Sequence, residues 1–293
     1  MNFLTMEEVK ALSHEKALSY CDEIRCHLID TVMVSGGHLA SNLGIVEISM
    51  ACVREFNLPT DKIIYDVGHQ SYVHKLLTGR FFTAETLRTF GNYSGFTKRE
   101  ESVFDPFGAG HSSTALSAAI GFATAARIKG EPDYTVAIVG DGAFSTGMTF
   151  EAFNNINKND RLIIILNDNE MSISKNVGSM SGYLLKMRST KKYLRLKHRT
   201  KNAFRKIPII GKPIAHVLGG IKYYVKKIVV KNNTFFDDLG VRYLGPADGN
   251  HLETVELLLK EAKTYNEPVL IHLCTKKGKG FQNAETDPDR YHS

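Results

Sequence analysis

An aspartate and an asparagine that follow two neighbouring apolar runs are of the types needed to hold a metal ion. Gly140-Asp141-Gly142 comes directly after one run, and Asn169 comes shortly after the next. One strand–helix–strand unit spans about 30 residues, which is close to the separation of Asp141 and Asn169, so we expect both side chains at the ends of parallel strands. Mg²⁺ prefers oxygen ligands and usually keeps phosphate oxygens and water. One carboxylate, one amide oxygen and one carbonyl would suit such a site.

The glycines of the same stretch favour a diphosphate beside the metal. Glycine lets the backbone approach a ligand closely, and the N–H groups at the start of the following helix attract negative charge. The alternative is a Gly-Asp-Gly turn that only reverses the chain, with Asn169 capping a helix. The order strand, GDG, helix, strand, NDN favours the diphosphate site. The chain has neither a GxxxxGK[ST] element nor a Rossmann fingerprint, since GAGHSS does not match one.

Four short apolar runs are typical of buried parallel strands. They lie at residues 63–67, 135–139, 162–166 and 269–273. Helical spacing fills the intervals at 9–34, 45–56, 113–128, 150–157 and 252–265, with a capping-box pattern at Thr5 and Glu8. This alternation predicts an α/β fold built on a doubly wound parallel sheet. Ligands bind such sheets beyond the carboxyl ends of the strands, where glycines and polar residues are mixed.

The positive charge of the chain is concentrated in one segment. The chain has 293 residues, a hydrophobic content of 43% and a net charge of +6, enough apolar material for a full core. Residues 186–231 contain fifteen Lys or Arg and no Asp or Glu, so the remainder is net negative. Such a segment could attract anionic substrates or nucleic acid. Its loosely helical apolar spacing and the lack of a nucleic-acid motif favour a solvated helical insertion at about 184–233.

The sequence gives no sign of export or membrane insertion. It has no signal-peptide pattern and no apolar run of roughly 18 residues. The four cysteines (Cys21, Cys26, Cys52 and Cys274) form no CxxC pair, which fits a reducing compartment. We therefore expect a cytoplasmic protein.

The ordered motifs resemble those of the 1-deoxy-D-xylulose-5-phosphate synthases, which are transketolase-like enzymes that use thiamine diphosphate. The matching segments are GGHLASNLGIVE, KIIYDVGHQSYVHKLLTGR, SGFTKREES, FDPFGAGHSST, ILNDNEMSIS and TKKGKGF. They extend over nearly the whole chain, taken as one domain of residues 1–293. The resemblance implies the diphosphate domain of the thiamine-diphosphate-binding fold. It also implies condensation of pyruvate with glyceraldehyde 3-phosphate and loss of CO₂.

The resemblance assigns residues to the cofactor and its metal. It implies that Mg²⁺ is held by Asp141, Asn169 and the backbone carbonyl of Met171. Implied contacts to the diphosphate are Gly110, His111, Ser112, Gly142 and Ala143. Lys276 and Lys279, in the last glycine loop, could neutralise the diphosphate.

Two histidines are implied as active-site residues near the cofactor and substrate. His38 and His69 each lie in a glycine-containing loop, and imidazole suits proton transfer because it titrates near neutrality. His74, five residues after His69, has weaker support. Two positions depart from the family pattern. Phe281 replaces a tyrosine beside the cofactor, which removes a hydrogen bond worth about 1 kcal/mol, and Asn250 replaces a histidine.

The resemblance also implies that the active site needs a second α/β domain. In this family that domain supplies the glutamate that acts on the aminopyrimidine ring, and neither it nor the C-terminal domain is found in this chain. We expect a partner chain that carries it, in a homodimer or heterotetramer, with no membrane or nucleic-acid partner. The alternatives are a truncated chain, a split transketolase acting on another sugar phosphate, and a catalytically silent binding protein.

Overall fold

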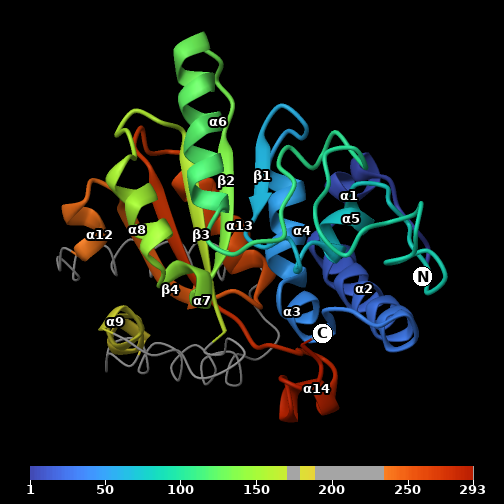
Figure 1. Cartoon of the computed structure of the whole chain (residues 1–293). Helices are drawn as coiled ribbons and strands as arrows, with labels where there is room; N and C mark the ends of the chain where they lie inside the picture. Colours follow the sequence, from blue (N-terminus) through green and yellow to red (C-terminus); the bar gives the residue numbers. More distant parts are fainter. Residues whose placement is uncertain (170–178, 189–233, 293) are drawn as a thin grey trace, which may run out of the picture.

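Five parallel strands form the sheet of this protein (Figure 1). The computed structural model describes residues 1–169, 179–188 and 234–292. The strands are β1 (Lys62–Tyr65), β2 (Thr135–Gly140), β3 (Leu162–Asp168), β4 (Arg242–Asp248) and β5 (Val269–Cys274), in the spatial order β1-β2-β3-β5-β4. All four neighbouring pairs are parallel. The predicted doubly wound parallel sheet is confirmed.

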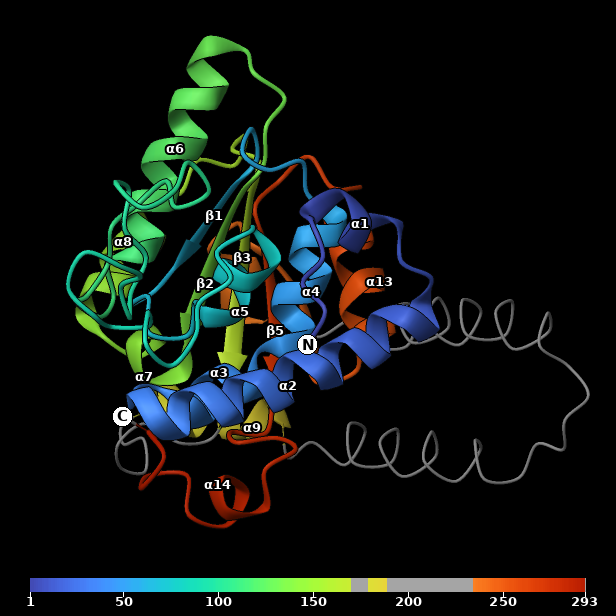
Figure 2. The same ribbon diagram turned by 90° about the vertical axis from the view of Figure 1, so that its right-hand side faces the viewer.

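Helices cover both faces of the sheet (Figures 1 and 2). One face packs against α1 (Met6–Ala11), α2 (His14–Ser35), α3 (Leu39–Gly44), α4 (Val46–Glu55), α5 (Tyr72–Leu77) and α13 (Leu252–Ala262). The other packs against α6 (Ala115–Lys129), α7 (Asp141–Phe144), α8 (Gly147–Asn154), α9 (Ser179–Arg188) and α12 (Phe235–Asp238). Because successive strand residues point to opposite faces, Ile163 and Ile165 join the first core and Ile164 the second. A last helix, α14 (Gln282–Thr286), follows β5.

The predicted strands and helices are confirmed with shifts of a few residues at their ends. The capping box at Thr5 and Glu8 is present at the start of α1. Strand β4 was not predicted, because Gly245-Pro246 in its middle is typical of a turn and proline donates no ladder hydrogen bond. The strand tolerates this pair because it lies at the edge of the sheet, with a register shift against β5 between Leu244 and Ala247.

The basic insertion predicted at about 184–233 lies almost entirely outside the described residues, apart from the end of α9. Among the helices that the structure describes, none is both long and apolar enough to cross a membrane.

The central strand β3 should dominate stability. We expect Ile164→Ala to lower the free energy of unfolding by about 2–5 kcal/mol, because Ile164 of β3 is fully buried in the core between the sheet and α6. Ile128→Ala, on the exposed side of α6, is the matched control and should change it by less than about 0.5 kcal/mol. Urea denaturation measures both. Equal losses of stability in the two variants would contradict the burial of Ile164 in the core between the sheet and α6.

Candidate functional site

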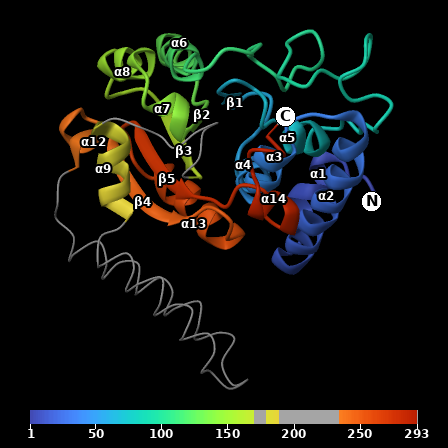
Figure 3. The same cartoon turned by 60° about the horizontal axis from the view of Figure 1, so that its bottom comes forward.

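The residues predicted to hold the metal leave the sheet side by side. Gly140 pairs with Asn167 in the β2–β3 ladder, so Asp141 and Asn169 emerge at the carboxyl ends of adjacent strands. Asp141 is buried at the start of α7, and Asn169 is half-buried. Helices α3 and α7 and the described C-terminus gather at this edge (Figures 1 and 3). Met171, the predicted third ligand, lies outside the described residues.

A buried lysine, Lys277, lies close enough to Asp141 for the carboxylate to affect the pKa of its ammonium group. The side chain of Lys277 is only 3% exposed, and its Nζ makes no hydrogen bond within the part of the chain that the structure describes. Its ion-pair contact with Asp289 is 3.8 Å long, beyond hydrogen-bond range. Burial lowers the pKa of the Lys277 ammonium, while the carboxylates of Asp289 and Asp141 oppose that shift. An unsatisfied buried ammonium is costly, so an anionic ligand here would be stabilised.

Asp66, just after β1, anchors the loop that contains the predicted diphosphate contacts. Its two carboxylate oxygens accept hydrogen bonds from the backbone N–H of Ser113 (2.7 Å) and Ala115 (3.1 Å). The Ser113 hydroxyl then donates to the carbonyl of Ala143 in α7 (3.3 Å). Gly110, His111 and Ser112 are exposed directly before this anchor, and Gly142 and Ala143 are half-buried. The two predicted diphosphate stretches are therefore tied together.

The loops of His38 and His69 are joined by Asn42, whose side chain is fully buried. Its Nδ2 donates to the carbonyls of His38 (2.7 Å) and His69 (2.8 Å), and its Oδ1 accepts from the N–H of Tyr72 (2.9 Å). The two imidazole rings lie 5.3 Å apart, centroid to centroid. The predicted histidine pair is thus brought together. Sequence reasoning missed Asn42, although it lies within the GGHLASNLG motif.

A tight approach of backbone to side chain shapes the His38 loop. Helix α2 is capped by Gly36, and the chain turns through Gly36 and Gly37 with φ of 70° and 130°, values that L side chains rarely adopt. A Cβ on Gly37 would come within 2.7 Å of the Tyr72 hydroxyl. This turn therefore requires a glycine at position 37.

A third histidine, His292, completes the cluster and was not predicted. Its ring centroid lies 5.9 Å from those of both His38 and His69. The tail reaches the site because the N–H of Ala40 donates to the carbonyl of Tyr291 (2.9 Å). No motif in the sequence gave a signal for this return of the chain.

The histidines of the cluster are held neutral. Burial, then the charges of His292 and Arg88, lowers the pKa of His38 to about 4. Burial, then the neighbouring His38 and His292, lowers the pKa of His69 to about 3. Each ring at neutral pH therefore has one N–H donor and one acceptor nitrogen, which suits donation to a developing alkoxide or acceptance of a proton.

The remaining predicted residues have other contacts. Lys276 pairs with Glu285, and its side chain is 60% exposed. Lys279 donates to Glu47 (2.6 Å). Phe281 packs edge-on against Tyr291, with ring centroids 5.4 Å apart. The lysine of this loop that faces the site region is therefore Lys277, while contacts of Lys276 and Phe281 with a cofactor stay predictions.

Asn250 and His74 have structural roles in the described residues. Asn250 links α3 to the last glycine loop, because its Nδ2 donates to the Gly44 carbonyl (2.8 Å) and its Oδ1 accepts from the N–H of Lys276 (2.7 Å). His74 is fully buried, with its Nε2 at 3.1 Å from the Phe104 carbonyl.

Buried charges hold the loop of residues 94–113 against α5. Arg80 donates two hydrogen bonds to the carboxylate of Asp105, at 2.7 and 2.9 Å. Burial alone would raise the pKa of Asp105, but hydrogen bonds from His74 and Arg80 hold it below its usual value. Lys75 pairs with Glu101 in the same cluster. These pairs position the loop that ends at Gly110, His111 and Ser112.

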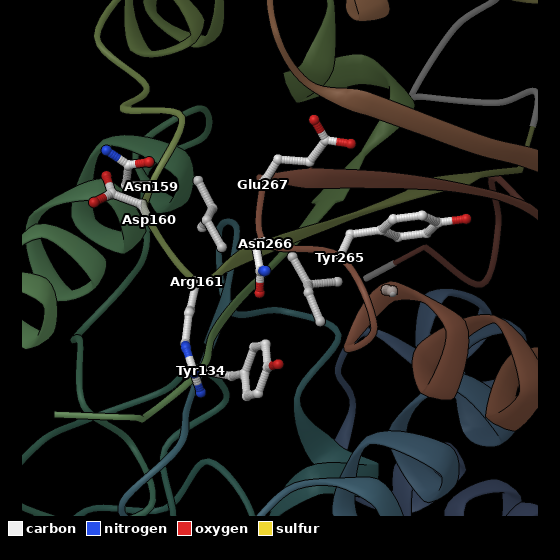
Figure 4. A pocket seen from close by; sticks show the side chains of 10 residues that line it. Tyr134, Asn159, Asp160, Arg161, Tyr265, Asn266 and Glu267 are labelled. Carbon is white, nitrogen blue, oxygen red and sulfur yellow. The ribbon is translucent and has the colours of Figure 1, made fainter.

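A cavity of about 180 Å³ lies at the amino ends of the strands, on the side of the sheet opposite to the candidate site (Figure 4). Tyr134, Arg161 and Glu267 line it, and these residues precede β2, β3 and β5 respectively. None of the predicted site residues lines this cavity. The candidate site is therefore the cluster at the carboxyl ends of the strands.

Comparisons with known proteins identify the family of this chain. The family profile described as 1-deoxy-D-xylulose-5-phosphate synthase matches residues 2–275. The chain belongs to this family. Two similar relatives are the 1-deoxy-D-xylulose-5-phosphate synthases of Clostridium kluyveri, 48% identical over 292 residues, and Caldanaerobacter subterraneus, 50% identical over 287. The matches cover 99% and 98% of this chain but only 47% and 46% of those proteins, so the chain spans about half their length.

Solved structures confirm the fold. Transketolase from Campylobacter jejuni matches with a TM-score of 0.69 at 18% identity, over 96% of this chain and 40% of that one. Transketolase from Leishmania mexicana matches with a TM-score of 0.59 at 20% identity, over 95% of this chain and 38% of that one. This member of the 1-deoxy-D-xylulose-5-phosphate synthase family thus has a transketolase-like fold, as the sequence predicted.

Asn42 should be essential for the geometry of the histidine cluster. We expect Asn42→Ala to lower the free energy of unfolding by about 3 kcal/mol, because it removes three hydrogen bonds that a fully buried side chain makes to the backbone. Asn92→Ala, at an exposed loop position, is the control. Urea denaturation gives the stability, and the imidazole NMR signals of His38 and His69 should shift in the first variant only. A stability loss equal to that of the control would refute the role of Asn42.

The neutral state of His69 should make stability depend on pH. Its folded pKa is below the unfolded value of about 6.5, so the unfolded chain binds the proton first and stability falls as pH drops from about 6.5 towards 3. Between pH 7 and 5, the wild type should lose about 2 kcal/mol more than His69→Gln. His14→Gln, an exposed histidine, should behave as wild type. Denaturation at both pH values measures this, and parallel losses in wild type and His69→Gln would contradict it.

Proposed function

We propose that this chain is the diphosphate-binding half of a synthase that uses thiamine diphosphate and Mg²⁺ to condense pyruvate with glyceraldehyde 3-phosphate, with loss of CO₂. The observation that carries the proposal is the neighbourhood of Asp141 and Lys277 at the carboxyl edge of the sheet. A carboxylate suits a hard cation, and a buried ammonium without a hydrogen bond among the described residues suits a phosphate oxygen. The residues present therefore fit a metal diphosphate.

The residues at this edge divide into metal and phosphate groups. We assign Asp141, Asn169 and the carbonyl of Met171 to Mg²⁺. The diphosphate contacts are Gly110, His111, Ser112, Gly142, Ala143 and Lys277, with Lys276 and Phe281 also near the cofactor in this assignment. The first stretch is held by Asp66, and the second starts α7, so both approach the metal position on anchored backbone.

The histidine cluster handles protons in this proposal. When bound, thiamine diphosphate supplies the carbon nucleophile and the electron sink of the reaction. His38 and His69 donate a hydrogen bond to oxygen atoms of the substrate or accept a proton from them, because both rings are neutral near pH 7. His292 lies against both rings and limits the space in which a small substrate can sit.

The proposed enzyme needs a second α/β domain that supplies the glutamate for the aminopyrimidine ring. The chain spans about half of its relatives' length, which supports a missing part. We place that part on a partner chain, in a homodimeric or heterotetrameric enzyme of the cytoplasm. The remainder of a longer polypeptide would serve the same role.

Two variants should weaken cofactor binding without unfolding the chain. We expect Asp141→Asn and Lys277→Met each to weaken the binding of thiamine diphosphate with Mg²⁺ by about 10- to 100-fold, the loss of one charge-assisted interaction. Lys158→Met, an exposed lysine, is the control. Isothermal titration calorimetry measures the affinity, and Lys276→Met shows whether the adjacent lysine shares the role. Unchanged binding in Asp141→Asn would contradict the metal assignment.

Reconstitution tests the reaction itself. The chain is mixed with a polypeptide that carries the second half of a family relative, together with thiamine diphosphate, Mg²⁺, pyruvate and glyceraldehyde 3-phosphate. CO₂ and 1-deoxy-D-xylulose 5-phosphate should form, and His69→Gln should reduce the rate. Product from ketose phosphates in place of pyruvate would indicate a transketolase reaction. No product from any donor would refute the enzymatic proposal.

A further inference from the structure

Three metal-ligating side chains that the proposed function leaves unassigned gather on one face of the sheet. Asp168 ends β3, and His272 and Cys274 lie two residues apart near the end of β5. Asp168 pairs with Cys274 across the ladder, so all three side chains point to the same face. One ligand atom from each lies within 4.8 Å of the other two.

We propose that Asp168, His272 and Cys274 bind a soft divalent metal ion such as Zn²⁺, at a site separate from the Mg²⁺ position. Thiolate and imidazole are ligands that Zn²⁺ accepts and Mg²⁺ avoids, so this set selects against the ion assigned to Asp141. Zinc often takes three protein ligands and a water in a tetrahedron. Its bond lengths of about 2.0–2.3 Å put neighbouring ligand atoms roughly 3.5 Å apart. The three ligand atoms therefore need to move by only about 1 Å to reach the distances of a zinc site.

Tyr243 of β4 prepares His272 for a metal. Its hydroxyl lies 2.8 Å from Nδ1 of His272, while Nε2 lies 2.8 Å from Oδ2 of Asp168. When a metal binds at Nε2, the imidazole proton moves to Nδ1 and donates to the Tyr243 oxygen, which can accept as well as donate. A hydrogen bond to the second ring nitrogen is the arrangement that orients histidine ligands. The ion replaces the Asp168–His272 hydrogen bond, and the Cys274 thiol releases one proton.

The burial of the cluster suits a specific site. His272 is fully buried and Asp168 is nearly so, while Cys274 is half-buried and gives access from solvent. The ring of Tyr243 stacks on Phe236 of α12 at a centroid distance of 5.9 Å, which fixes its hydroxyl. The carbonyl of Asp168 also accepts from the N–H of Thr275 (2.9 Å), so the two strand ends are already joined.

Cobalt(II) provides a direct test because a thiolate ligand gives it a charge-transfer absorption band. We expect one equivalent of Co²⁺ to produce that band in the reduced chain, and Zn²⁺ to abolish it by displacement. Cys274→Ser should remove the band, while Cys26→Ser, which changes the exposed cysteine of α2, should keep it. No band in the wild type, or a band that survives in Cys274→Ser, would overturn the proposal.

Two further variants separate a metal site from a structural hydrogen-bond network. Tyr243→Phe keeps the aromatic ring and should weaken Zn²⁺ affinity by about 10-fold, as loss of an outer hydrogen bond does. Asp141→Asn should leave the cobalt band unchanged, because Asp141 belongs to the other site. Circular dichroism confirms that each variant is folded. Loss of the band in Asp141→Asn would assign the metal to the cofactor site, and Zn²⁺ affinity unchanged in Tyr243→Phe would refute the role of its hydroxyl.

Discussion

The buried carboxamide of Asn42 fixes the relation between two loops that are distant in sequence. Its three hydrogen bonds reach the carbonyls of His38 and His69, which are partly buried, and the N–H of Tyr72, which is fully buried. Buried polar groups without partners are costly, so these bonds define one arrangement of the loops. Without these bonds, no shared side chain would connect the end of α2, the turn after β1 and the start of α5. The rings of the histidine cluster would then have no fixed geometry.

The other side of the site uses buried charge in the same way. Asp66 accepts from backbone N–H groups at the start of α6, and Asp105 accepts a double hydrogen bond from Arg80. Asp66 lies directly after β1, and Asp105 lies in the loop of residues 94–113 that packs against α5. The parallel sheet brings the loops to one edge, and buried side chains decide how they meet there.

Local patterns allowed much of this to be predicted from the sequence. The four apolar strands and the adjacency of Asp141 and Asn169 follow from periodicity and from the span of one strand–helix–strand unit. Strand β4 could not be predicted, because Gly245-Pro246 is tolerated only at an edge that tertiary structure creates. The roles of Lys277 and His292 depend on how the last loop and the tail fold back, which no local pattern records.

Among the described residues, the hydrogen-bond partners of the Asn42 side chain and of the Asp66 carboxylate all belong to the main chain. The hydrogen bonds of Asn42 therefore do not depend on which side chains stand at positions 38 and 69, provided that the backbone keeps its path. Substitutions at those positions alter the chemistry offered to a ligand while the supporting bonds persist. Such an arrangement makes the site evolvable, because new substrate preferences can arise without a new fold.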